Sequence, residues 1–279
     1  MRDVPSTADL RARATLLGAL RSWFASHGFL EIDVPVLVAS GALEEHLEAL
    51  AVDGRFLHTS PEFALKRVLA AGLPRIYCIT PCFRGEELGR LHGTEFTMLE
   101  WYRTGVGYRE IADDLVALLA AAAAALAVRF PAVEHLSVAD AYERHAGGRP
   151  DDAIEAQRAW VAHVEPALVA PTIVWDYPAD EAAFATVRGT VAERFELYWR
   201  GVELANAFSE LGDADELRAR WQANNRAREA AGRLPHPIDE RLVDAVRHHP
   251  RAGGIAVGVD RLLAVLLGRD DIHPLRVGG

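Results

Sequence analysis

Residues 82–103 constrain the fold of this chain more than any other segment. They read CFRGEELGRLHGTEFTMLEWYR, two alternating runs on either side of a polar turn over residues 87–93, and this pattern predicts a β-hairpin. Successive side chains of a strand point to opposite faces, so Arg84 and Glu86 would share one face of the first run. One face of the second run would carry Phe96, Met98, Glu100 and Tyr102. One wall of the hairpin would therefore combine a guanidinium, carboxylates, a phenol and an aromatic ring.

The other face of the second run is apolar and carries Leu99 and Trp101. A half-buried strand places its apolar side chains on the core, so the charged face is the one that remains accessible. We interpret that face as the floor of a ligand site. The alternative is an exposed sheet face with a chance salt bridge.

The length and charge of the chain limit the possible functions. With 279 residues it is long enough for one large domain or two small ones, and no repeat, linker or composition shift marks a boundary. We therefore expect a single domain over residues 1–279. The 30 Lys and Arg against 40 Asp and Glu give a formal net charge of −10, which disfavours broad RNA binding and favours a cationic small substrate.

The cysteines and the apolar segments indicate a cytoplasmic protein. Cys78 and Cys82 lie in a strand-like run, which favours buried thiols over zinc ligands or a disulfide. The first ten residues contain no apolar signal core, and the most hydrophobic stretch, residues 115–128, is too short to span a bilayer.

Capping signals and apolar spacing predict most helices and strands. Ser6 begins a helix that ends near His27, and Ser60 with Pro61 begins a second one. Glu62 lies in the first turn of that second helix, where the helix dipole alone can explain an acid. Further helices are predicted over residues 108–128, 137–145, 151–164, 217–231 and 259–268. Strands are predicted over residues 29–38, with a break at Pro35, and over 172–177, 194–199, 202–208 and 253–258.

Two further groups of residues point to phosphate chemistry. Glu196 and Glu203 lie on opposite arms of a tight turn, and two adjacent carboxylates are unfavourable unless a cation lies between them. The pair therefore predicts Mg²⁺, although two separately solvated glutamates fit the spacing equally well. Asn206 and Glu210 continue this polar series. Arg261 lies in the first turn of a helix, where free N–H groups and a guanidinium attract phosphate.

Together these motifs resemble one family. Residues 83–86 (FRGE) with 95–96 (EF) are similar to the second motif of class II aminoacyl-tRNA synthetases, and residues 258–261 (GVDR) to the third. Pro35 falls where the first motif ends. Residues 59–62 (TSPE), 95–100 (EFTMLE) and 203–211 (ELANAFSEL) resemble the lysyl-tRNA synthetase catalytic domain.

The resemblance covers nearly the whole chain, which begins at the first helix of that catalytic domain. We therefore expect no N-terminal anticodon-binding domain. The resemblance then extends to the stand-alone paralogues of the domain, which attach β-lysine to a lysine of translation elongation factor P.

The resemblance implies an α+β fold with a mostly antiparallel sheet flanked by helices, and a homodimer formed through residues 29–38. It implies a ligase that uses ATP and Mg²⁺ to activate lysine, in particular (R)-β-lysine, as an aminoacyl-adenylate. The acceptor would be elongation factor P, and the missing anticodon-binding domain argues against tRNA binding. The alternatives are a ligase with another acceptor, such as tRNA or a carrier protein, and an inactive sensor. A sensor would lack a catalytic arginine or a metal carboxylate, and this chain has both.

The resemblance also assigns roles to individual residues. Arg84 would bridge the substrate carboxylate and the α-phosphate, Arg261 would hold the γ-phosphate, and Phe96 would stack on adenine. Further nucleotide contacts would come from Glu86, His92 and Gly258. Mg²⁺ would lie on Glu196 and Glu203. The distal ammonium group of lysine would be bound by Glu100, Tyr102 and Glu210, and the nearer amino group by Glu62 and Asn206.

Four residues depart from the pattern of the tRNA-charging enzymes or of the subfamily. Ala205 stands where the tRNA-charging enzymes have glycine, and an added methyl group in the pocket wall should change which lysine isomer fits, an effect of about 1–3 kcal/mol. Gly85 and Gly93 both stand where the subfamily usually has asparagine, and these two departures put the conformation of the hairpin loop in question. Ala207 either narrows the pocket or has no effect.

Overall fold

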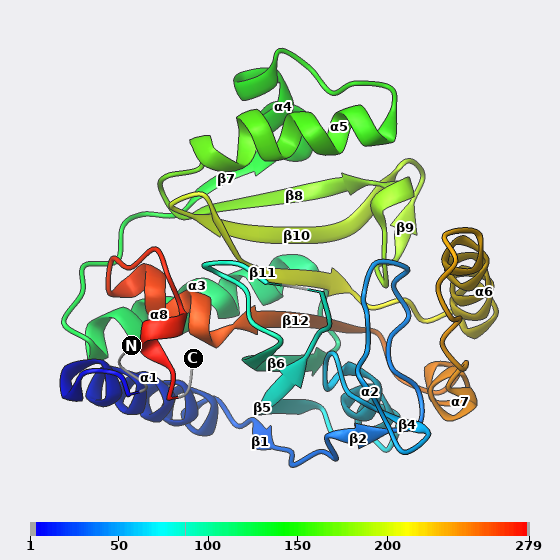
Figure 1. The fold of residues 1–279 in the computed structure, drawn as a ribbon, viewed down its shortest axis with the longest axis horizontal. Helices are drawn as coiled ribbons and strands as arrows, with labels where there is room; N and C mark the ends of the chain where they lie inside the picture. Colours follow the sequence, from blue (N-terminus) through cyan, green and yellow to red (C-terminus); the bar gives the residue numbers. More distant parts are fainter. Residues whose placement is uncertain (1–3, 87, 278–279) are drawn as a thin grey trace.

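A nine-stranded, mostly antiparallel sheet organises the computed structural model, which describes residues 4–86 and 88–277 (Figure 1). The strand order is β1-β5-β6-β12-β11-β10-β8-β7, and β9 pairs with β10. The only parallel neighbours in this described sheet are β1 with β5 and β7 with β8. The strands are β1 Leu30–Glu31, β5 Arg75–Phe83, β6 Glu95–Thr104, β7 Glu134–Ser137, β8 Thr172–Pro178, β9 Val187–Arg188, β10 Val191–Trp199, β11 Val202–Ser209 and β12 Ala252–Gly258.

Helices flank this sheet, as predicted for an α+β fold. They are α1 Thr7–Ser26, α2 Glu62–Ala70, α3 Tyr108–Ala125, α4 Val138–Ala146, α5 Ala153–Ala159, α6 Ala214–Ala230, α7 Glu240–Val246 and α8 Val259–Leu266. A π-helix, Trp160–Val164, continues α5. A small second sheet consists of β2 Leu37–Val38, β4 Arg55–Leu57 and β3 Ala51–Val52. Among the described residues no helix is long and apolar enough to cross a membrane.

The predicted hairpin is formed by β5 and β6, which pair in register from Arg75 opposite Arg103 to Phe83 opposite Glu95. The faces predicted for β6 are confirmed, because Leu99 and Trp101 belong to the main hydrophobic core while Glu100 and Tyr102 face the other side. Both cysteines are free and buried, as expected.

The strand placement predicted for Arg84 and Glu86 is wrong, because β5 ends at Phe83. Glu86 has a φ of +62°, a left-handed conformation that turns the chain out of the strand direction. The predicted turn includes Glu87, which lies outside the described residues, as do Met1–Asp3 and residues 278–279.

The two faces of the sheet are covered differently. On one face α1, α3 and α8 bury a continuous core. On the other face α2 covers one end, over β5 and β6, and α4 with the π-helix covers the opposite end, over β8 and β10. Between these two groups, parts of β6, β11 and β12 line a cavity, and the site lies there.

Several element boundaries differ from the predictions. Residues 29–38 form two short strands that join different sheets, because the segment around Pro35 leaves the main sheet after β1. Helix α2 begins at Glu62, one residue later than predicted, with Ser60 Oγ accepting the Glu62 N–H at 3.0 Å. Helix α3 ends at Ala125 rather than at residue 128. Helix α6 begins at Ala214, where Asp213 caps it. Neither β7 nor α7 is predicted by the sequence patterns.

Candidate active site

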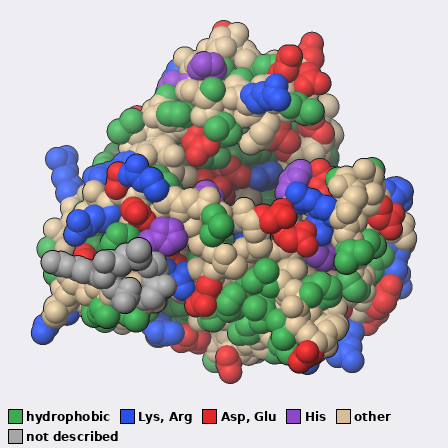
Figure 2. Space-filling model, viewed as in Figure 1, with side chains coloured by type: hydrophobic (Ala, Val, Ile, Leu, Met, Phe, Trp, Pro, Cys, Tyr) green, Lys and Arg blue, Asp and Glu red, His purple; other side chains and the backbone are tan. Residues whose placement is uncertain are grey.

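The site is a cavity of about 470 Å³. Its walls come from β6, β11 and β12, the start of α2 and the loop over residues 40–47. Figure 2 shows a hollow in the middle of this face, in which acidic side chains gather. The volume is in the range of pockets that enclose a small substrate.

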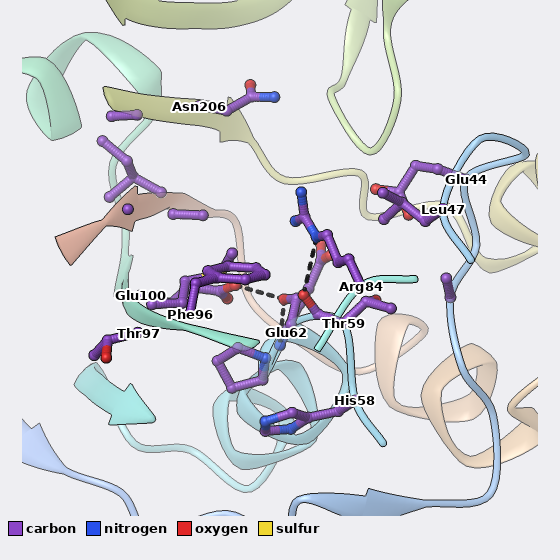
Figure 3. A pocket seen from close by; sticks show the side chains of 18 of the residues that line it. Glu44, Leu47, His58, Thr59, Glu62, Arg84, Phe96, Thr97, Glu100 and Asn206 are labelled. Atoms are coloured by element: carbon purple, nitrogen blue, oxygen red, sulfur yellow. Dashed lines mark hydrogen bonds between the residues drawn. The ribbon is translucent and has the colours of Figure 1, made fainter. Parts of the chain in front are cut away.

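Every predicted site residue except Glu86 borders this cavity. These residues are Glu62, Arg84, His92, Phe96, Glu100, Tyr102, Glu196, Glu203, Ala205, Asn206, Glu210, Gly258 and Arg261. Figure 3 shows Glu62, Arg84, Phe96 and Glu100 around one space, with Asn206 on the strand across from them. Glu86 is exposed, and its carboxylate lies 3.5 Å from the Arg233 guanidinium.

Buried carboxylates form one end of the cavity. Glu100 accepts hydrogen bonds from Ser60 Oγ at 2.5 Å and from Tyr102 OH at 3.1 Å. Glu62 and Glu210 lie on either side of an internal cation, the Lys66 ammonium group, at 2.6 and 2.7 Å. Three elements distant in sequence thus bring three acids together in a site that can bind ammonium groups.

Burial shifts the acid–base equilibria of these carboxylates. It raises the pKa of Glu62 to about 8, although the Lys66 charge opposes the rise. It also raises the pKa of Glu100 to about 7, against the hydrogen bonds from Ser60 and Tyr102. Charged carboxylates are costly to bury without a cation, so both acids favour a cationic ligand.

Two guanidinium groups also border the cavity. Arg84 lies over the Phe96 ring at 5.2 Å, and its Nε donates to the Thr59 carbonyl at 3.4 Å. Arg261, in the first turn of α8, donates to the Leu91 and Glu203 carbonyls at 3.1 and 3.0 Å. These cations and the nearby aromatic ring suit a nucleotide.

Glu196 and Glu203, the pair predicted to hold Mg²⁺, both border the cavity. Glu196 is buried, and it accepts hydrogen bonds from Arg194, Tyr177 and Tyr198. Glu203 has a side chain that is 39% exposed, and partial desolvation, followed by the charge of Glu196, raises its pKa to about 7, so a cation between the two would relieve their repulsion.

The acids alone do not complete a metal site. Within the described part of the chain, no group of three His, Cys, Asp or Glu could hold a metal ion. Mg²⁺ is commonly held by one or two carboxylates together with substrate phosphates, and the pair fits that arrangement.

The strand register determines on which face of the sheet the side chains of Ala205 and Ala207 lie. Ala205 borders the cavity, but its cross-strand neighbour is Val257 and both belong to the core on the far face. Asn206 and Ala256 are the corresponding pair on the pocket face. The Ala205 methyl group therefore does not form the pocket wall as predicted. Ala207 also lies in that core and does not narrow the pocket.

Asn206 is oriented by Arg194, whose Nε donates to the Asn206 side-chain oxygen at 3.2 Å. This contact uses one of the two lone pairs of that oxygen, so the side chain can still accept from an amino group and can donate from its NH₂. The contact with the nearer amino group stays a prediction.

The departure at Gly85 is explained by close packing against the loop over residues 40–48. The Gly85 N–H donates to the Glu48 carbonyl at 2.7 Å, and a Cβ atom at Gly85 would lie 3.3 Å from that oxygen. Glycine therefore lets this loop pack against the end of the hairpin.

Three site residues were not identified from the sequence. Lys66 follows Glu62 by one helical turn, and Arg194 precedes Glu196 by two residues on the same strand, so spacing was the available signal. Tyr177 is brought to Glu196 by strand pairing alone, and no local pattern indicates it.

Comparison with known proteins places the chain among synthetases. Residues 1–277 match a family model described as tRNA synthetases class II (D, K and N). A protein of Yersinia enterocolitica named elongation factor P–(R)-β-lysine ligase is 36% identical, over 95% of this chain and 93% of the relative. Proteins of the same name from Vibrio cholerae and Erwinia tasmaniensis are 35% and 38% identical, over 96% and 94% of this chain and 94% and 92% of each relative.

Proposed function

Since this chain belongs to the class II (D, K and N) tRNA synthetase family, we propose that it is an ATP-dependent ligase that activates (R)-β-lysine and transfers it to a lysine of elongation factor P. One observation carries the proposal: a single cavity is lined both by buried carboxylates and by the guanidinium groups of Arg84 and Arg261. A diamino acid carries charges complementary to this lining: its two ammonium groups suit the carboxylates, and its carboxylate, which reacts with ATP, suits the guanidinium groups.

In the first step a carboxylate oxygen of the amino acid attacks the α-phosphorus of ATP. An acyl–phosphate bond forms, the bond to the β-phosphate breaks, and pyrophosphate leaves. Arg84 neutralises the carboxylate and the α-phosphate together, and Asn206 contacts the amino group nearer that carboxylate. Arg261 binds the terminal phosphate and Phe96 stacks on the adenine. Glu196 and Glu203 would hold Mg²⁺, which supplies further neutralisation of phosphate charge.

In the second step the ε-amine of the acceptor lysine attacks the carbonyl carbon of the adenylate. An amide bond forms, AMP leaves with the bonding electrons, and the amine loses a proton. A second cavity, of about 570 Å³, shares Glu196, Glu203 and Asn206 with the first and gives the acceptor a route to the carbonyl. No protein side chain forms a covalent bond in either step, so the enzyme accelerates the reaction by positioning the reactants and neutralising their charges.

The proposal extends to the partners of the enzyme. A translation factor as acceptor places the reaction in the cytoplasm, and the net charge of −10 argues against tRNA. A homodimer through residues 29–38 is supported by the position of β1 at the sheet edge, where Leu30 is 52% exposed.

Amino-acid-dependent ATP–pyrophosphate exchange with (R)-β-lysine, α-lysine, ornithine and arginine tests this proposal. Exchange should be fastest with a lysine isomer, and labelled lysine should then appear on purified elongation factor P. Label on tRNA alone would replace the proposed acceptor. No exchange with any of the four amino acids would exclude the ligase.

The affinity for lysine should increase as the pH rises from 6 to 8, because the pKa values of the carboxylates are raised. Glu62 and Glu100 bind an ammonium group only when ionised, and their pKa values are about 8 and about 7. The KM for lysine should therefore fall by about tenfold between pH 7 and 8, and more steeply, by up to about 50-fold, between pH 6 and 7, where both acids titrate. The empty protein should respond oppositely: the folded-state pKa values exceed the ordinary 4.5, so its Tm should decrease as pH rises towards 8.

Thermal unfolding from pH 6 to 8.5, with and without lysine, measures both effects. The stabilisation by lysine should grow with pH while the Tm of the empty protein falls. A KM and a lysine-induced shift that stay constant over this range would show that the two acids remain ionised throughout.

A further inference from the structure

Lys66 lies behind the acidic end of the pocket and does not border the cavity. It is one turn after Glu62 in α2, and its side chain is 2% exposed. Its ammonium group contacts one oxygen of Glu62 at 2.6 Å and one of Glu210 at 2.7 Å, and it lies 4.2 Å from the centre of the Phe184 ring. Lysine is rarely buried to this extent unless it is fully paired.

The charges at this end of the pocket can be counted. Glu62, Glu100 and Glu210 carry three negative charges when ionised, and Lys66 cancels one of them. Two charges remain among these four buried side chains, which equals the number of ammonium groups on a diamino acid. Without Lys66 the same three acids would require a third cation or a bound proton.

Lys66 also leaves acceptor oxygens for the substrate. It contacts Oε2 of Glu210, while Oε1 of Glu210 is buried and has no hydrogen-bond partner among the described residues. A buried oxygen of this kind is costly unless a ligand supplies a donor.

We propose that Lys66 is a positioning residue that makes the pocket select amino acids with two ammonium groups, by neutralising one of the three carboxylates and orienting Glu62 and Glu210. The inference rests on the proposed function and adds a specificity-determining residue that never touches the substrate. A monoamino acid then leaves one carboxylate unpaired in the pocket.

The Lys66→Met variant tests the inference by comparing its KM for (R)-β-lysine with its KM for ATP. The KM for (R)-β-lysine in pyrophosphate exchange should rise on the order of 100-fold, because two buried carboxylates lose their shared cation. The KM for ATP should stay within about twofold, since Lys66 does not border the cavity and Arg84 and Arg261 are unchanged in the variant. Arg67→Met is the matched control: Arg67 is the next residue of α2, and its ion pair with Asp239 lies outside the pocket. This control should leave both KM values unchanged.

Chemical rescue separates this role from a merely structural one. Lys66→Ala lacks three carbons and the nitrogen, so added propylammonium should lower its KM for (R)-β-lysine while leaving wild type and Arg67→Met unaffected. If the neutral variants fail to fold, Lys66→Arg keeps the charge and should hold the KM for lysine within about tenfold of wild type.

The outcomes distinguish this inference from the proposed function. Wild-type protein that exchanges no amino acid excludes both. If the wild-type protein does catalyse exchange, three results would each overturn the role of Lys66 and leave the proposed function intact. They are an unchanged KM for lysine in Lys66→Met, an equal rise in its KM for ATP, and no effect of propylammonium on Lys66→Ala. A Lys66→Arg variant that folds but loses lysine binding overturns it as well.

Discussion

Arg84→Ala is expected to slow (R)-β-lysine-dependent pyrophosphate exchange by about 10³-fold, because the variant loses the cation placed between the two reacting anions. Negative charge builds up on the α-phosphate as the carboxylate oxygen attacks, so most of the loss should appear in kcat. Arg84→Lys should recover little, because a single ammonium group cannot reproduce a planar guanidinium that spans two anions.

Arg103→Ala is the control for this experiment. Arg103 lies in the same hairpin, but it pairs with Asp114 of α3 at 2.9 Å and does not border the cavity. Its removal should lower the Tm slightly and leave kcat unchanged. Equal losses of activity in the two variants would indicate damage to the hairpin rather than removal of a catalytic group.

Gly254→Ala is expected to raise the KM for (R)-β-lysine on the order of 10²–10³-fold, because the added methyl group has no room beside the ammonium-binding side chains. A Cβ atom at Gly254 would lie 2.2 Å from Glu210 Oε1 and 2.4 Å from Tyr102 Cε1. Both side chains must shift, and overpacking of this kind costs about 1–3 kcal/mol of stability. The KM for ATP should change little, since the nucleotide end of the cavity is untouched.

Gly212→Ala provides the comparison, because a Cβ atom there would meet nothing within 4 Å. It lies two residues after Glu210 and should leave both KM values at the wild-type level. An unchanged KM for lysine in Gly254→Ala would show that Glu210 and Tyr102 do not bind the ammonium group. Elution volume in gel filtration and the Tm establish whether the variant is folded.

The fold class and much of the site could be predicted from local patterns. The alternation over residues 95–104 was enough to place Glu100 and Tyr102 opposite Leu99 and Trp101, because strand geometry depends only on neighbouring residues. The position of Arg261 in a first helical turn followed equally from a glycine-bounded strand and the helix after it. The family motifs then indicated lysine and ATP, and the family is confirmed by the match over residues 1–277.

Errors arose where a local sequence pattern continued beyond the end of the strand, or where it did not show which face a side chain is on. Glu86 continues the alternation of the hairpin in sequence, but the chain leaves the strand after Phe83 and carries Glu86 into solvent. Ala205 lies within a motif of site residues, yet strand register turns its methyl group into the core. Neither outcome can be deduced from spacing, because strand ends and register depend on the partner strands.

By itself, the sequence determined which side chains are chemically suited to the site: the carboxylates, the guanidinium groups and the aromatic ring that recur in its motifs. Only the tertiary structure decided how they combine. It brought Lys66 of α2 against Glu210, and it packed Gly254 so closely on Tyr102 that only glycine fits. The physical reason is that charge balance and close packing are properties of contacts between distant segments, which exist only after the strands have paired and the helices have covered the sheet.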